Sequence, residues 1–158
     1  MSLEAEVGDL LRQKGLTLGV VESASGGLIS HRITNVAGSS DYYKGSVTAY
    51  SNKVKIKVVG VKEATINQYG AVSPQVAEEM AQRGRKILAA DICLADTGIA
   101  GPSGASPGKP VGLFYIGLSH GERTFSRKHN FHGDREENKQ SAAEAALSWL
   151  KEYLLSLK

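Results

Sequence analysis

The stretch that decides the fold runs from residue 16 to residue 36 and reads LTLGVVESASGGLISHRITNV. Residues 16–23 have the nearly continuous apolar composition of a buried strand. Two glycines follow, and residues 28–36 resume with a pattern typical of a helix. A strand, a glycine loop and a helix in this order indicate an α/β fold, and they place the start of a helix at the loop.

The segments on either side repeat this alternation of strands and helices. Helices are predicted at residues 3–14, 51–59 and 74–90 and after Gly133, and strands at residues 45–50, 92–100, 113–119 and 121–132. Ser73 and Pro74 give a strong helix start, and Gly15 a helix stop. We therefore expect one domain over residues 1–158, a three-layer α/β/α fold whose mixed, mostly parallel sheet includes an antiparallel hairpin member.

Composition excludes several classes of function. Of the 158 residues, 41% are hydrophobic and 22% are charged, which is typical of a globular chain. The net charge is +3, and basic residues are interleaved with acidic ones, so nucleic-acid binding is not expected. A small anionic ligand and an ordinary solvated surface both fit this charge.

Cysteine and histidine usage indicates a cytoplasmic protein without a metal or cofactor. The single Cys93 lies in an apolar run and cannot form a disulfide within the chain. No segment has the roughly 20 apolar residues of a membrane span, and the first residues lack the pattern of a signal peptide. The four histidines show no paired spacing with other metal-ligating residues.

The first glycine loop carries candidate site residues. Ser23 and Ser25 precede Gly26 and Gly27 at the expected helix start, where free N–H groups and the helix dipole favour an anion. Alternatively, Ser25 caps the helix and the glycines only permit a tight turn. Glu22 could orient a ligand amide or bond to loop N–H groups.

Two further segments add chemistry at the ends of other strands. Tyr50 and Lys55 flank a strand-to-helix junction; Lys55 is either an ordinary surface lysine or, if burial lowers its pKa, a general base. Thr97 and Gly98 begin a second glycine-rich loop, whose N–H groups could hold a phosphate or an oxyanion. Ligands bind at the carboxyl ends of the strands in such sheets.

The motifs in order are ESASGG (22–27), AGSSDYYKGSVTAYSNKVK (37–55), GAVS (70–73), DTGIAGPSG (96–104), KPVG (109–112) and GDR (133–135). This string resembles the CinA C-terminal domain family, whose standalone members include nicotinamide-nucleotide amidases. The resemblance extends from about Leu11 to the last helix. It implies a mixed-sheet α/β/α fold.

The resemblance also implies an activity: hydrolysis of the carboxamide of nicotinamide mononucleotide to nicotinate mononucleotide and ammonia, without a metal. By motif position, Ser23 is the nucleophile and Lys55 the base, assisted by Tyr50. The residues expected to contact the nucleotide substrate are Glu22, Ser25, Gly26, Gly27, Thr97, Gly98, Gly101, Arg135 and Lys139. Which glycine loop would hold the phosphate and which the oxyanion is left open.

Two departures from the family pattern affect these expectations. The family often has ESCTGG where this chain has ESASGG, so the serine is kept without the cysteine. Lys139 stands where the family has an arginine, which keeps the charge but loses the two-pronged grip on phosphate. Arg135 remains a candidate phosphate partner.

Other functions fit parts of the pattern. A nucleotide-binding module with a regulatory role in competence or DNA damage, and little catalysis, is the alternative to an amidase. A structural or assembly protein would use the glycine loops as turns only. A homo-oligomer is also possible, with the apolar last helix and the hairpin as its interface.

Overall fold

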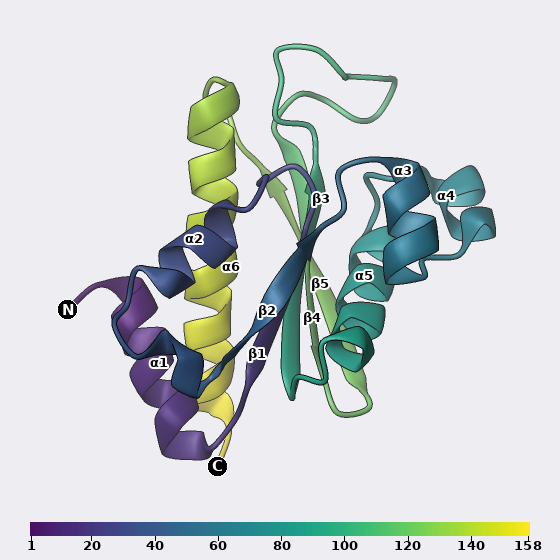
Figure 1. The fold of residues 1–158 in the computed structure, drawn as a ribbon. Coiled ribbons are helices and arrows are strands. Elements are labelled where there is room, and N and C mark those ends of the chain that lie inside the picture. Colours follow the sequence, from purple (N-terminus) through teal and green to yellow (C-terminus); the bar gives the residue numbers. More distant parts are fainter.

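A five-stranded sheet forms the centre of the computed structural model, which describes all 158 residues (Figure 1). The strands are β1 (Leu18–Glu22), β2 (Tyr43–Thr48), β3 (Ile92–Gly98), β4 (Leu113–His120) and β5 (Arg123–Asn130). Their spatial order is β2-β1-β3-β4-β5, with β1 parallel to β2 and β3, and β4 antiparallel to β3 and β5. Only β4 runs against the other four, so the predicted mixed sheet with one antiparallel member is confirmed.

Helices cover both faces of the sheet, which confirms the three-layer prediction (Figure 1). One face carries α1 (Leu3–Lys14), α2 (Leu28–Thr34) and α6 (Arg135–Ser156). The other carries α3 (Asn52–Val54), the π turn η2 (Lys55–Val59), α4 (Glu63–Tyr69) and α5 (Pro74–Ile87). The 3-10 turn η1 (Ser39–Asp41) precedes β2, and neither η1 nor α4 was predicted. None of the helices combines the length and the apolar character needed to cross a membrane.

Side chains on the central strands alternate between the two helical layers. Val20 and Leu94 belong to the core beneath α1, α2 and α6, whereas Val21 and Ala95 belong to the core beneath α5. Because successive side chains point to opposite faces of a sheet, Glu22 and Asp96 follow the first pair and face the α2 and α6 side. Thr97, at the end of β3, faces the α5 side.

Helix α5 lies very close to the sheet because glycines stand at the points of contact. A Cβ atom on Gly117 of β4 would lie 2.3 Å from the Ala77 carbonyl oxygen of α5. A Cβ atom on Gly84 of α5 would lie 2.3 Å from a methyl group of Val21. The helix begins as predicted, with the Ser73 hydroxyl accepting the Val76 N–H and Pro74 at the first helical position.

The apolar side of α6 is buried within the chain itself. The buried residues Ala146, Trp149, Leu150 and Leu154 pack in the same core cluster as side chains of α1 and α2, and Ala142 packs against Phe114 in a smaller cluster. Asp134 and Glu137 form a capping box at its start. This apolar face is therefore covered by the protein's own core, and a homo-oligomer formed through the last helix and the hairpin stays a prediction.

Candidate active site

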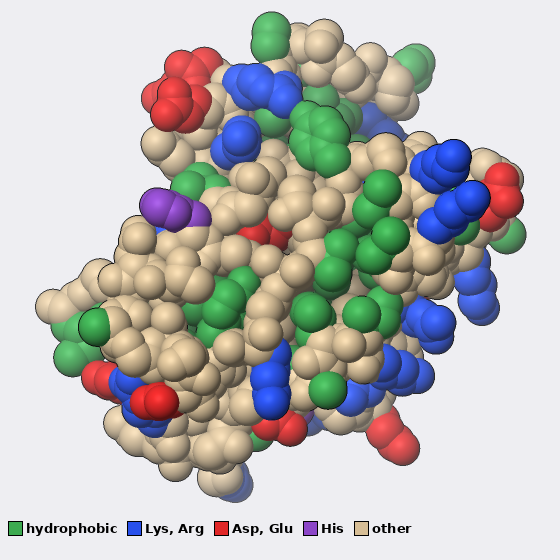
Figure 2. Space-filling view, in the orientation of Figure 1, with side chains coloured by type: hydrophobic (Ala, Val, Ile, Leu, Met, Phe, Trp, Pro, Cys, Tyr) green, Lys and Arg blue, Asp and Glu red, His purple; other side chains and the backbone are tan.

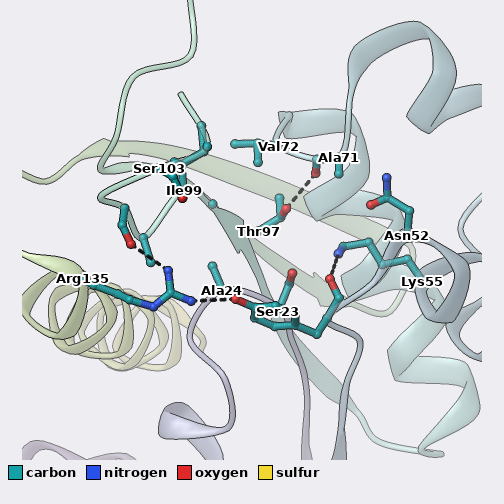
Figure 3. Close-up of a pocket in the computed structure, with 15 residues that line it drawn as sticks. Ser23, Ala24, Asn52, Lys55, Ala71, Val72, Thr97, Ile99, Ser103 and Arg135 are labelled. Carbon is teal, nitrogen blue, oxygen red and sulfur yellow. Dashed lines mark hydrogen bonds between the residues drawn. The ribbon is translucent and has the colours of Figure 1, made fainter. Parts of the chain in front are cut away.

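A cavity of about 350 Å³ opens at the carboxyl ends of β1 and β3, where the two glycine loops were expected to lie (Figure 3). We call it the Ser23 cavity. Its fifteen lining residues come from the loops after β1, β2 and β3, the segment before α5 and the start of α6. Of the predicted site residues, it brings together Ser23, Tyr50, Lys55, Thr97, Gly98, Gly101 and Arg135.

Ser23 is the first residue after β1 and is nearly buried, with 6% of its surface exposed. Its backbone N–H donates to the Asp96 carboxylate at 3.0 Å. Its hydroxyl lines the cavity, and Figure 3 shows it extending from the strand end towards the same space as the Lys55 amine. The backbone of Ser23 is thus held while its hydroxyl faces the cavity.

Lys55 is 2% exposed, so the interpretation as an ordinary surface lysine is wrong. It is the first residue of η2, directly after the short helix α3 that the Ser51 hydroxyl caps. Single π turns occur frequently at functional sites. Burial lowers the pKa of the Lys55 amine, and the Asp96 charge opposes this effect. A lysine with a lowered pKa can serve as a base.

Tyr50 contacts Lys55 through its backbone and not through its ring. Its carbonyl oxygen accepts the Lys55 Nζ hydrogen bond at 3.0 Å, and no hydrogen bond joins that amine to Ser23. The Tyr50 side chain is 60% exposed, and its hydroxyl accepts a 2.8 Å bond from Arg135. The predicted pairing of Tyr50 with Lys55 is therefore made by the Tyr50 carbonyl oxygen, while the Tyr50 hydroxyl bonds Arg135.

Arg135, from the first turn of α6, joins two loops at the cavity. Besides Tyr50, it donates to the Gly101 carbonyl oxygen at 2.7 Å (Figure 3). Nearby, the amide of Asn138 donates to the Ala100 carbonyl oxygen at 3.0 Å. Asn138 is fully buried and was not predicted, although its place one turn after the GDR motif is a usable signal.

The end of β3 supplies Thr97 and the second glycine loop. The Thr97 hydroxyl donates to the Ala71 carbonyl oxygen at 2.7 Å, which ties the segment before α5 to the cavity wall. Gly98 has no room for a side chain, because a Cβ atom would lie 2.4 Å from the Phe114 ring. The N–H groups of Ala100 and Gly101 make no hydrogen bond within the protein.

The anion expected at the start of α2 is Glu22 of the protein itself. Its fully buried carboxylate accepts the N–H groups of Gly27, Ile29 and Ser30 at 3.1, 2.9 and 2.9 Å. The Gly26 N–H donates to the Ser23 carbonyl oxygen at 3.0 Å. The prediction that Gly26 and Gly27 offer free N–H groups to a substrate is therefore wrong, and Glu22 has a structural position beneath the loop.

Ser25, Gly26, Gly27 and Lys139 lie beside the Ser23 cavity and do not line it; they line a smaller neighbouring cavity. The Ser25 hydroxyl lies 2.7 Å from a Glu22 oxygen and also bonds Asp96, so it does not cap α2. Lys139 lies over Gly26, with its Nζ 3.2 Å from where a Cβ would stand. Arg135, not Lys139, is the cation from α6 that reaches the Ser23 cavity.

Asp96 is the main site residue that the prediction missed. It is fully buried and accepts the backbone N–H groups of Ser23 and Ser25, each at 3.0 Å. Burial raises its pKa to about 6, against the lowering effect of its hydrogen-bond donors. The signal was present in the sequence, since a carboxylate in the apolar strand 92–98 must be matched by buried donors.

The charges around the Ser23 cavity favour an anionic ligand. The Arg135 guanidinium lines it, Lys55 is the other basic side chain there, and no aspartate or glutamate lines it. Figure 2 shows further basic side chains over α3 and α4, beside this end of the sheet. No three histidine, cysteine, aspartate or glutamate side chains are grouped as a metal site requires.

Comparisons with known proteins agree with this fold and this arrangement of motifs. The family model described as the CinA C-terminal domain matches residues 1–154. A CinA-like protein of Salinibacter ruber is 49% identical over 147 residues, covering 93% of this chain and 36% of the relative. A CinA-like protein of Kosmotoga olearia is 46% identical over 156 residues, covering 99% of this chain and 38% of the relative.

Solved structures give the same result. The crystal structure of the competence damage-inducible protein A from Klebsiella pneumoniae matches with a TM-score of 0.96 at 30% identity, covering 99% of this chain and 97% of that chain. A competence/damage inducible protein from Agrobacterium tumefaciens matches with a TM-score of 0.87 at 31% identity, covering 96% of both chains. The chain spans less than two-fifths of the length of the two curated relatives above. It belongs to the CinA C-terminal domain family.

Proposed function

We propose that this chain is an amidohydrolase that converts nicotinamide mononucleotide to nicotinate mononucleotide and ammonia. The observation that carries the proposal is the pairing, in one cavity, of a serine hydroxyl with a buried lysine whose pKa is lowered. An amide is a poor electrophile, so a serine needs a base to remove its proton and donors for the oxyanion that forms. Family membership supports the proposal, because the family includes amidases.

The reaction proceeds in two balanced steps. Neutral Lys55 takes the proton of the Ser23 hydroxyl as its oxygen attacks the carboxamide carbon, and the same amine then returns a proton to the departing NH₂ group as ammonia. The product is an ester between Ser23 and the pyridine carbonyl. Lys55 then takes a proton from water, whose oxygen attacks this ester, and the amine returns that proton to the departing Ser23 oxygen, which releases the carboxylic acid and restores Ser23.

In this proposal the backbone N–H of Ala24 donates the hydrogen bond that stabilises the oxyanion. The N–H group of Ala24 makes no hydrogen bond within the protein and belongs to the residue directly after Ser23, and Ala24 lines the cavity. A backbone N–H next to the nucleophile is an established oxyanion donor in serine hydrolases. The N–H groups of Gly26 and Gly27, which are already bonded, are excluded.

Arg135 and the second glycine loop bind the phosphate group of the substrate in this proposal. The free N–H groups of Ala100 and Gly101 lie on this loop, and Arg135 already bonds the Gly101 carbonyl. A guanidinium with adjacent backbone N–H groups provides both charge and directed donors for phosphate oxygens. This assignment leaves Ser23 and Lys55 to the carboxamide end of the substrate.

Ammonia release from nicotinamide mononucleotide by the purified chain tests the proposal. We expect release by the unmodified protein and a fall of at least about 1,000-fold in Ser23→Ala, since loss of a nucleophile removes most of the rate. Ser40→Ala, which changes an exposed serine in η1, is the matched control and is expected to keep the full rate. No release at micromolar enzyme would contradict the proposal, and tight binding of the mononucleotide without release would favour the regulatory nucleotide-binding alternative.

A further inference from the structure

Asp96 holds the loop that carries Ser23 at two points. One carboxylate oxygen accepts the Ser23 N–H at 3.0 Å, and the other accepts the Ser25 N–H at 3.0 Å. The Ser25 hydroxyl also bonds Asp96. The N–H between them, that of Ala24, is left without a partner in the protein. The two bonds thus fix the backbone on both sides of the free N–H group.

The geometry requires a carboxylate at this position. Two N–H groups approach two different oxygens of one short side chain, which is fully buried. An asparagine of the same shape has only one acceptor oxygen, so its NH₂ group would face one of the two N–H donors. A buried N–H without an acceptor destabilises the fold, because it has lost its hydrogen bond to water. The loop would relieve this cost by moving.

We propose that Asp96 is a positioning residue for catalysis, which sets the Ser23 hydroxyl and the Ala24 N–H through its bonds to the backbone of Ser23 and Ser25. The role rests on the proposed amidase function for its kinetic consequence. Asp96 does not line the Ser23 cavity, so it acts through the loop and does not touch the substrate. Asp96 opens the DTGIAGPSG motif (96–104), but it was not among the predicted site residues.

Asp96 also acts on Lys55 by its charge. The Asp96 carboxylate raises the pKa of the Lys55 amine, against the larger lowering by burial. The other charged groups nearby are Glu22 from β1, which raises the pKa of Asp96, and Arg135 from α6 across the cavity. Glu79 of α5 is engaged with the Lys62 N–H. Removing the Asp96 charge therefore lowers the pKa of Lys55 further.

The kinetic experiment compares Asp96→Asn with Asp91→Asn. Asp91 is an exposed aspartate just before β3, bonded to Thr17. For Asp96→Asn we expect kcat to fall about 100-fold, as for a nucleophile displaced by about 1 Å, with KM little changed. We also expect the acidic limb of its pH profile to move to lower pH, which a purely structural change would not cause. Asp91→Asn is expected to leave kcat, KM and the pH profile unchanged.

Amide hydrogen exchange tests the positioning without any assay of activity. In the unmodified protein the Ser23 and Ser25 amides should exchange slowly and the Ala24 amide faster, because only Ala24 lacks an acceptor. Asp96→Asn should lose protection at Ser23 or Ser25. The comparison of the Ser23, Ala24 and Ser25 amides can be made even if Asp96→Asn folds poorly, because it needs only the unmodified protein.

The outcomes separate this inference from the proposed function. If the protein shows the expected exchange pattern but no amidase activity, the proposed amidase function and the kinetic role of Asp96 are both overturned. The claim that Asp96 holds the Ser23 loop would still stand. An active protein in which Asp96→Asn keeps kcat and the pH profile overturns the inference alone. Ser25→Ala keeps both N–H bonds to Asp96, so its loss in kcat should be smaller than that of Asp96→Asn; an equal or larger loss would also overturn the inference.

Discussion

At the scale of a single residue, the burial of Lys55 lowers the stability of the fold. A lysine that is 2% exposed has lost the hydration of its charge, and one hydrogen bond to the Tyr50 carbonyl replaces it. The pKa of its amine is therefore lower in the folded chain than in the unfolded chain. The folded state binds fewer protons between these two pKa values, so this residue's contribution to stability rises with pH across that window and is lost as pH falls.

Replacing this lysine by a methionine should therefore stabilise the protein and inactivate it. We expect Lys55→Met to raise the free energy of unfolding by about 1 to 2 kcal/mol, because an apolar side chain of similar length removes the desolvation cost. Ammonia release should fall by about 100- to 10,000-fold, the usual contribution of a general base. Thermal unfolding and the ammonia assay measure the two effects; a destabilised variant that keeps its rate would contradict both.

The same scale explains which site residues could be predicted. Ser23, Lys55 and Thr97 were predicted by the residues around them and by the family resemblance, and the structure brings all three to one cavity. The sequence left open whether Glu22 bonds the loop N–H groups, and it did not reveal that the Gly26 N–H bonds the Ser23 carbonyl oxygen, because both contacts depend on how the loop lies in space. For the same reason the sequence did not indicate which atom of Tyr50 contacts Lys55, which is the carbonyl oxygen.

At the scale of an element, α2 is a short helix that the buried Glu22 carboxylate stabilises at its N-terminus. It has seven residues and no side-chain cap at Gly27. The buried Glu22 carboxylate takes the place of the cap by accepting the first N–H groups of the helix, where the helix dipole favours negative charge. The loop that holds Ser23 thus depends on a carboxylate at each end, Asp96 on β3 and Glu22 on β1.

Changing Glu22 to glutamine should weaken this element. One carboxylate oxygen becomes an NH₂ group, so the N–H and hydroxyl of Ser30 lose their acceptor. We expect Glu22→Gln to lower the free energy of unfolding by about 1 to 3 kcal/mol in urea denaturation. Glu136→Gln, an exposed glutamate in the first turn of α6, is the matched control and should change stability by less than about 0.5 kcal/mol. Equal effects of the two changes would show that Glu22 does not cap α2.

The whole molecule places its site where three parallel strands end together. β1, β2 and β3 run in one direction, so the loops that carry Ser23, Tyr50 and Thr97 emerge at the same edge of the sheet (Figure 1). Sequence periodicity predicted this architecture because β1, β3, β4 and the long helices have apolar patterns, and the polar β5 was predicted from its turn with β4. It did not predict α4, whose seven residues bury little apolar surface, or the order of the strands, which depends on contacts distant in sequence.

The close distance between the sheet and α5 can be tested at Gly117. Gly117→Ala would place a methyl group 2.3 Å from the backbone of α5, which cannot move as a side chain end can. We expect a loss of about 1 to 3 kcal/mol in the free energy of unfolding, the usual cost of overpacking. Urea denaturation measures it. A variant as stable as the unmodified protein would mean that α5 does not lie this close to the sheet.

The most direct test of the account is to trap the ester on Ser23. The unmodified chain is mixed with nicotinamide mononucleotide, quenched in acid within milliseconds to seconds and measured as intact protein by mass spectrometry. We predict a mass increase equal to one acyl group of the substrate, located on the peptide that contains Ser23, and no increase in Ser23→Ala. Release of ammonia at an undiminished rate in Ser23→Ala, or an acyl adduct located on a peptide without Ser23, would contradict a serine nucleophile in this cavity.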